Sequence, residues 1–198
     1  MISTEDFAAL VSSRICHDLI SPIGAIGNGV ELLTMTGHGD GPELALINDS
    51  AESASARVRF FRIAFGSAKE GQAIGAEEIQ TILSARAKDG RFLYVWTEDR
   101  PIDRSEAKLI FLMILCAEHA LPRGGKIRAS RNLGGWIVET AVGQAHLDPD
   151  LWAALERREA PRPLDSGRIQ FAALAMMLGT LDQRLSVGHN DGQLTLSL

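Results

Sequence analysis

One short segment, residues 17–22, holds the side chains best suited to chemistry. His17 is followed directly by Asp18, and Pro22 comes five residues after the histidine. A neutral imidazole is available near pH 7 and is a competent nucleophile. An adjacent carboxylate can orient the ring or accept its proton. We therefore take His17 as the candidate nucleophile and Asp18 as its orienting group or base.

The residues around this histidine favour contact with another protein. A single histidine on a helix is usually a surface or core-edge residue. Here Pro22 lacks an N–H group and clashes with the carbonyl of Asp18, so we expect a bend that opens space beside the imidazole. Gly24, Gly27 and Asn28 follow His17 by 7, 10 and 11 residues, on nearly the same helix face. Such small residues would let a second protein approach the backbone closely.

Two long helices over residues 1–68 are expected to position this segment. In both, apolar or small residues recur at alternating steps of three and four, which is a heptad pattern. The pattern comprises Ser12, Cys16, Leu19, Ile23, Ile26, Val30 and Leu33, then Leu44, Ile47, Ala51, Ala54, Val58, Phe61 and Phe65. The glycine-rich stretch 37–41 separates the helices and predicts an antiparallel hairpin. Pairing with a second copy, as a dimeric four-helix bundle, would bury the remaining apolar faces.

A second region, residues 75–198, follows a predicted linker at 66–75. Propensities and turn signals favour helices over 77–87, 103–121, 150–158 and 169–182, and strands over 91–97, 126–131, 136–142, 184–187 and 193–197. This pattern predicts helices over a mostly antiparallel sheet. The fold class is therefore α+β, with one domain at 1–68 and another at 75–198.

The sequence His17-Asp18-Leu19-Ile20-Ser21-Pro22 resembles the phosphoacceptor box of sensor histidine kinases. This resemblance implies that His17 carries a phosphoryl group. In those kinases an ATP-binding module follows the hairpin, and Pro122-Arg123-Gly124-Gly125 matches one of its turns. Its other motifs are missing. Cys116 replaces an asparagine, 141–145 read Ala-Val-Gly-Gln-Ala in place of Asp-x-Gly-x-Gly, and 169–174 lack the glycine-rich lid.

The whole pattern resembles the ChpT-type histidine phosphotransferases of bacterial phosphorelays. The resemblance implies a degenerate histidine-kinase-like ATPase α/β sandwich after the bundle. It also implies a homodimer that accepts a phosphoryl group from the receiver domain of a hybrid histidine kinase and passes it to response-regulator receiver domains. No cofactor is expected on this chain, and the receiver would supply Mg²⁺.

We assign receiver binding to a set of residues on both helices. The set is Arg14, Ile20, Ser21, Gly24, Gly27, Asn28, Arg57 and Phe60. Phe60 lies beside the heptad positions of its helix, so packing against the second domain is an equally good interpretation.

Composition and residue spacing argue against several other classes of protein. The 198 residues include 20 basic and 25 acidic side chains, a balance that argues against nucleic-acid binding. The longest apolar run, 109–117, is far shorter than the ~20 residues that span a bilayer, and the first residues do not predict a signal peptide. Cys16 and Cys116 are expected in the core, and His38, His119, His146 and His189 have no metal-ligand spacing. We therefore expect a cytoplasmic protein without a membrane partner.

Two alternative functions remain open. A non-catalytic dimeric interaction module or kinase regulator would retain the hairpin without using His17. An ATP-dependent histidine kinase is disfavoured because the nucleotide-binding motifs are missing.

Overall fold

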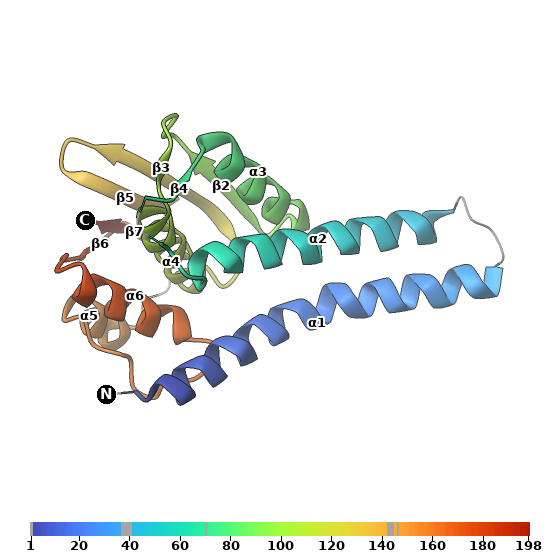
Figure 1. Cartoon of the computed structure of the whole chain (residues 1–198), viewed down its shortest axis with the longest axis horizontal. Helices are drawn as coiled ribbons and strands as arrows, with labels where there is room; N and C mark the ends of the chain where they lie inside the picture. Colours follow the sequence, from blue (N-terminus) through green and yellow to red (C-terminus); the bar gives the residue numbers. More distant parts are fainter. Residues whose placement is uncertain (1, 37–40, 70, 142–144, 146) are drawn as a thin grey trace.

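The computed structural model describes residues 2–36, 41–69, 71–141, 145 and 147–198. Two long helices, α1 (Thr4–Thr36) and α2 (Pro42–Ala64), lie side by side and run in opposite directions (Figure 1). The remaining elements gather at the end where α1 begins and α2 ends (Figure 1). Most of the glycine-rich stretch predicted to connect the helices, 37–40, lies outside the described residues.

Local sequence explains where these helices begin and how closely they pack. The Ser3 hydroxyl accepts a hydrogen bond from the Asp6 backbone N–H at 3.0 Å, which caps α1. Pro42 begins α2, where its missing N–H costs nothing. A Cβ atom on Gly29 would lie only 2.5 Å from Cγ1 of Ile47, so glycine permits the close approach of α1 and α2.

The heptad positions are only partly covered within one chain. Ile23 and Val30 on α1 are 56% and 50% exposed, and Val58 on α2 is 49% exposed. Cys16 is also exposed, so its assignment to the core is wrong for the single chain. Its thiol lies on the uncovered part of the same heptad stripe, which the sequence pattern alone could not distinguish from a buried part.

The second region contains a five-stranded sheet with helices packed on it. Its elements are α3 (Ala76–Arg86), the short helix η1 (Ala87–Asp89), β2 (Phe92–Trp96), α4 (Arg104–Ala120), β4 (Gly125–Asn132), β5 (Gly135–Thr140), α5 (Pro149–Glu156), α6 (Ile169–Thr180), β6 (Ser186–Asn190) and β7 (Gln193–Ser197). The strand order is β2-β4-β5-β7-β6. Only the β2–β4 pair is parallel, so the prediction of a mostly antiparallel sheet is confirmed.

Two details differ from the sequence prediction. The predicted linker at 66–75 contains β1 (Ala73–Ile74), which pairs antiparallel with β3 (Ile102–Asp103). Strands of two residues are too short for a periodic signal. The strand predicted at 184–187 lies instead at Ser186–Asn190, because the tight turn consists of Asp191 and Gly192 alone, both with positive φ.

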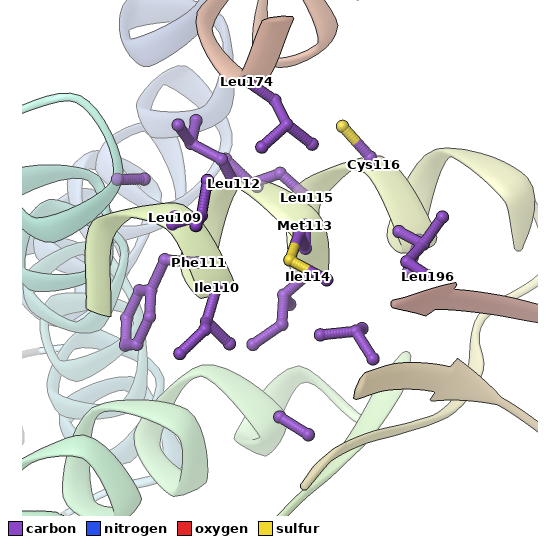
Figure 2. Packing of buried hydrophobic residues seen from close by; sticks show 14 of the residues in the cluster. Leu109, Ile110, Phe111, Leu112, Met113, Ile114, Leu115, Cys116, Leu174 and Leu196 are labelled. Atoms are coloured by element: carbon purple, nitrogen blue, oxygen red, sulfur yellow. The ribbon is translucent and has the colours of Figure 1, made fainter. Parts of the chain in front are cut away.

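Helix α4 forms the centre of the core. Every residue from Leu109 to Ala117 is at most 2% exposed. Leu174 of α6 and Leu196 of β7 face it from different sides (Figure 2). The apolar run that is too short to span a membrane is therefore a helix buried on all sides. In the described part of the chain no helix has the length and apolarity needed to cross a membrane.

The core extends from α4 into the end of α2. Phe60 is fully buried, and its ring centroid lies 4.7 Å from that of Phe111. The assignment of Phe60 to receiver binding is therefore wrong, because its apolar ring packs on the second region. Trp96, Trp136 and Trp152 are buried, as predicted.

A buried ion pair lies beside this aromatic contact. The Arg86 guanidinium donates to the Glu118 carboxylate at 2.7 Å and stacks over the Phe60 ring at 4.4 Å. Burial by itself would lower the pKa of Arg86, but Glu118 and Tyr94 together outweigh this effect and raise that pKa above its usual value. Tyr94 also donates to Glu118, at 2.7 Å. These contacts join α3, β2 and α4 at the place where α2 docks.

Candidate functional site

His17 lies in the middle of α1 with its side chain 83% exposed. Its Nδ1 atom lies 3.2 Å from Oδ1 of Asp18. Asp18 can accept a hydrogen bond from Nδ1 when Nδ1 carries the hydrogen, and in that tautomer the free lone pair of the ring is on Nε2. Within the described ranges, Nε2 has no hydrogen-bond partner in the protein. The exposed nitrogen is therefore free to act as a nucleophile.

Asp18 is held far more firmly than the histidine beside it. Its side chain is 12% exposed, and its Oδ2 atom accepts a hydrogen bond from Nε of Arg14 at 3.1 Å. Arg14 precedes Asp18 by one helical turn, where an arginine and an aspartate can pair. The two carboxylate oxygens thus face different partners, one the imidazole of His17 and the other a guanidinium.

The backbone of Asp18 has an unusual partner. Pro22 has no N–H with which to close the helical hydrogen bond to the Asp18 carbonyl. Nη1 of Arg57 on α2 instead donates to this carbonyl oxygen at 3.4 Å, and Nη2 of Arg57 donates to Oδ2 of Asp89 at 3.2 Å. Sequence reasoning selected Arg57 but missed Asp89. Their contact depends on how η1 docks beside α2, which leaves no signal in the sequence.

The other selected residues of α1 lie near His17 on its exposed surface. Ile20 is 69% exposed. Ser21, Gly24, Gly27 and Asn28 are exposed as well. A Cβ atom added at Gly24 or Gly27 would have no neighbour within 4 Å. We call Ile20, Ser21, Gly24, Gly27 and Asn28 the α1 face; at Gly24 and Gly27 it presents backbone without a side chain to the solvent.

A shallow groove adjoins the α1 face. It lies between α1, α2 and η1 and is lined by Ser21, Pro22, Ala25, Asp49, Ser50, Ser53, Arg57, Lys88 and Asp89. Lys88 on one wall pairs with Glu52 of α2. The surface next to His17 therefore includes residues of α2 and η1 in addition to α1.

The described residues offer little for other chemistry. No group of three or more His, Cys, Asp or Glu side chains in them could hold a metal ion. Burial raises the pKa of the Cys116 thiol well above its usual value, so it is a poor nucleophile. Burial, with Arg168 and Arg14 nearby, lowers the pKa of His119. His38, His146 and the motif positions 142–144 lie outside the described residues.

Three comparisons with known proteins bear on this site. Residues 76–193 match the family model described as the histidine phosphotransferase C-terminal domain. A curated relative, the protein phosphotransferase ChpT of Brucella abortus (strain 2308), is 36% identical over 175 residues, which cover 85% of this chain and 83% of that protein. The residues 17–22 lie in the part of the chain that precedes the family-model match.

Solved structures give a similar result. A structure described as a bacterial phosphotransferase superposes with a TM-score of 0.79 at 31% identity, covering all of this chain and 97% of the other. The histidine kinase AdeS of Acinetobacter baumannii gives a TM-score of 0.44 at 14% identity, covering 91% of this chain and 94% of that one. That second likeness is too weak to support an argument, whereas the first supports the same overall fold.

Proposed function

This chain belongs to the histidine phosphotransferase family, and on that premise we propose that Nε2 of His17 carries the phosphoryl group. The chain is a phosphotransferase of a phosphorelay and not an ATP-dependent kinase. The observation that carries the assignment of His17 is its exposed ring, with Nδ1 facing Asp18 and Nε2 free. The direct test compares transfer from a phosphorylated receiver domain to the wild-type chain and to the His17→Gln variant.

The proposed transfer needs few groups from this chain. The Nε2 lone pair attacks the phosphorus of an aspartyl phosphate on a receiver domain. A P–N bond forms, the P–O bond to the aspartate breaks, and the aspartate leaves as a carboxylate. The imidazole becomes positively charged, and the Asp18 carboxylate beside Nδ1 stabilises that charge. Attack by an aspartate of a second receiver reverses these steps and restores neutral His17.

The donor and acceptor in this proposal are both receiver domains. One belongs to a hybrid histidine kinase and the other to a response regulator. Besides His17, the side chains contacting Asp18 belong to two arginines, so this site suits an anionic phosphoryl group better than Mg²⁺. We therefore assign the Mg²⁺ to the receiver and no cofactor to this chain. The exchange would take place in the cytoplasm, without nucleic acid.

We further propose that two chains form a four-helix bundle through α1 and α2. The uncovered apolar side chains Ile23, Val30 and Val58 would be buried between the copies. The wild-type chain should therefore have the mass of a dimer in light scattering at micromolar concentration. The double variant Ile23→Glu/Val30→Glu should be monomeric, because carboxylates cannot be buried unpaired.

A control separates dimer loss from a general effect of added charge. Ile20 is an exposed isoleucine on the same helix, in the α1 face, and Ile20→Glu should remain dimeric. A wild-type monomer at tens of micromolar would contradict the bundle. A monomeric Ile20→Glu would show that the dimer interface includes the α1 face, contrary to the proposed bundle.

The α1 face should dock the receiver domain. Gly24→Leu should weaken receiver binding about tenfold or more, because the new side chain occupies space that a partner backbone would fill. The variant should still fold, since a Cβ atom at Gly24 has no neighbour within 4 Å and leucine has a higher helix propensity than glycine. Calorimetric titration with a receiver domain measures the change.

Gly179 supplies a matched control on α6. It is also an exposed helical glycine whose added Cβ atom would meet nothing within 4 Å. Gly179→Leu should bind the receiver as the wild type does. If Gly24→Leu binds with unchanged affinity, the docking surface lies elsewhere on the hairpin.

A further inference from the structure

Two arginines hold Asp18, and each has a second contact in the region after residue 75. Arg14 pairs with the Asp18 carboxylate, and its Nη1 donates to the Gly167 carbonyl at 3.4 Å. Arg57 contacts the Asp18 carbonyl and also pairs with Asp89. The residue next to the proposed phosphoacceptor is therefore connected to the second region on two sides, before α6 and at the end of η1.

The contact of Arg57 compensates for the proline in α1. Without a Pro22 N–H, the Asp18 carbonyl needs a donor from elsewhere. The Arg57 side chain is only 23% exposed, and its two terminal nitrogens both have partners within this chain. A guanidinium engaged in this way is poorly placed to reach a docking protein. The sequence-based assignment of Arg57 to receiver binding therefore needs a different interpretation.

We propose that Arg57 is a positioning residue, which fixes Asp18 through its carbonyl and so keeps the carboxylate of Asp18 against Nδ1 of His17. This inference rests on the proposed role of His17. Asp89 completes the arrangement, because it pairs with the second nitrogen of the guanidinium and restricts its motion. Arg57 transmits the position of η1 to α1 without touching the reacting atoms.

The chemical consequence lies in the tautomer of His17. A carboxylate near Nδ1 favours the neutral form with hydrogen on Nδ1 and the lone pair on Nε2. If Asp18 shifts with its backbone, that preference weakens and a larger fraction of the imidazole carries its hydrogen on Nε2, where it cannot attack. Docking of a receiver on the α1 face would be unaffected. The rate of transfer within the docked complex would fall.

Arg57→Met tests this inference, because methionine keeps much of the side-chain length but removes both hydrogen bonds. In the receiver-free dimer, ¹⁵N chemical shifts of the His17 ring should move toward the Nε2–H tautomer. The single-turnover rate constant at saturating phosphorylated receiver should fall about tenfold, as expected when a reacting group is slightly misplaced. The receiver concentration giving half-maximal rate should stay within about twofold of the wild type.

Two further variants make the result specific. Arg59→Met removes the same charge from an exposed position on α2 and should leave both measurements unchanged. Asp89→Asn preserves the shape of the acceptor while removing its charge, and should reproduce the ¹⁵N change and the rate loss in smaller degree. If thermal unfolding shows that Arg57→Met is not folded, the ¹⁵N shifts and the rate constant of Asp89→Asn test the role of Arg57 instead.

The outcomes that overturn the inference are distinct. If Arg57→Met raises only the half-saturating receiver concentration, Arg57 contacts the receiver directly. If neither the ¹⁵N shifts nor the rate changes in either variant, Arg57 does not position Asp18. Failure of the proposed function would appear differently, as continued transfer by His17→Gln, and would leave the ¹⁵N result for the free dimer intact.

Discussion

The His17→Gln variant should accept no phosphoryl group from a phosphorylated receiver, while its fold and dimer remain unchanged. Glutamine has no nucleophilic nitrogen, because its amide lone pair is delocalised. The His17 side chain is 83% exposed, so its replacement should change the free energy of unfolding by only about 0.5 kcal/mol or less. Radiolabel transferred from the receiver, detected as acid-labile phosphate on the chain, measures the effect.

His119 provides the control for this experiment. It lies on α4, and burial lowers its pKa. His119→Gln should accept label as the wild type does. ATP in place of the phosphorylated receiver should label none of the three proteins. Label shuttled between two receivers by His17→Gln would refute the assignment of His17 and favour a different phosphoacceptor.

Much of the site could be predicted because its signals are local. His17, Asp18 and Pro22 are close in sequence, and one helix fixes their relative positions. The exposure of Gly24 follows from the same helical periodicity. The heptad pattern of 3 and 4 likewise predicts α1 and α2, since both helices place their apolar residues on one stripe.

The errors concern contacts between elements distant in sequence. Phe60 is one residue before the heptad position Phe61. Only the docking of α4 determines that its ring is buried against Phe111. Cys16 belongs to the heptad stripe, but the part of the stripe that α2 covers depends on how the helices cross. The Arg57–Asp89 pair requires η1 to lie beside α2. Periodicity reports which face of a helix is apolar but not which neighbour covers it.

Asp18→Asn should slow transfer from a saturating phosphorylated receiver by about 10²-fold, within the 10²–10⁴ range typical of a positioned acid–base group. The amide oxygen can still accept from Nδ1 of His17, so part of the orientation survives. The variant loses the negative charge that stabilises the imidazolium formed when Nε2 is phosphorylated. It also leaves Arg14 without its ionic partner. The loss should therefore be smaller than that of His17→Gln but larger than that of Arg57→Met.

Quench-flow measurement of a single turnover gives this rate constant directly. Glu31→Gln is the matched control, because it also neutralises a carboxylate on α1 but at an exposed position beyond the α1 face. It should transfer at the wild-type rate. If Asp18→Asn also transfers at the wild-type rate, the carboxylate neither selects the tautomer nor stabilises the charged ring. The contacts of Arg14 and Arg57 with Asp18 would then serve only to hold α1 against the second region.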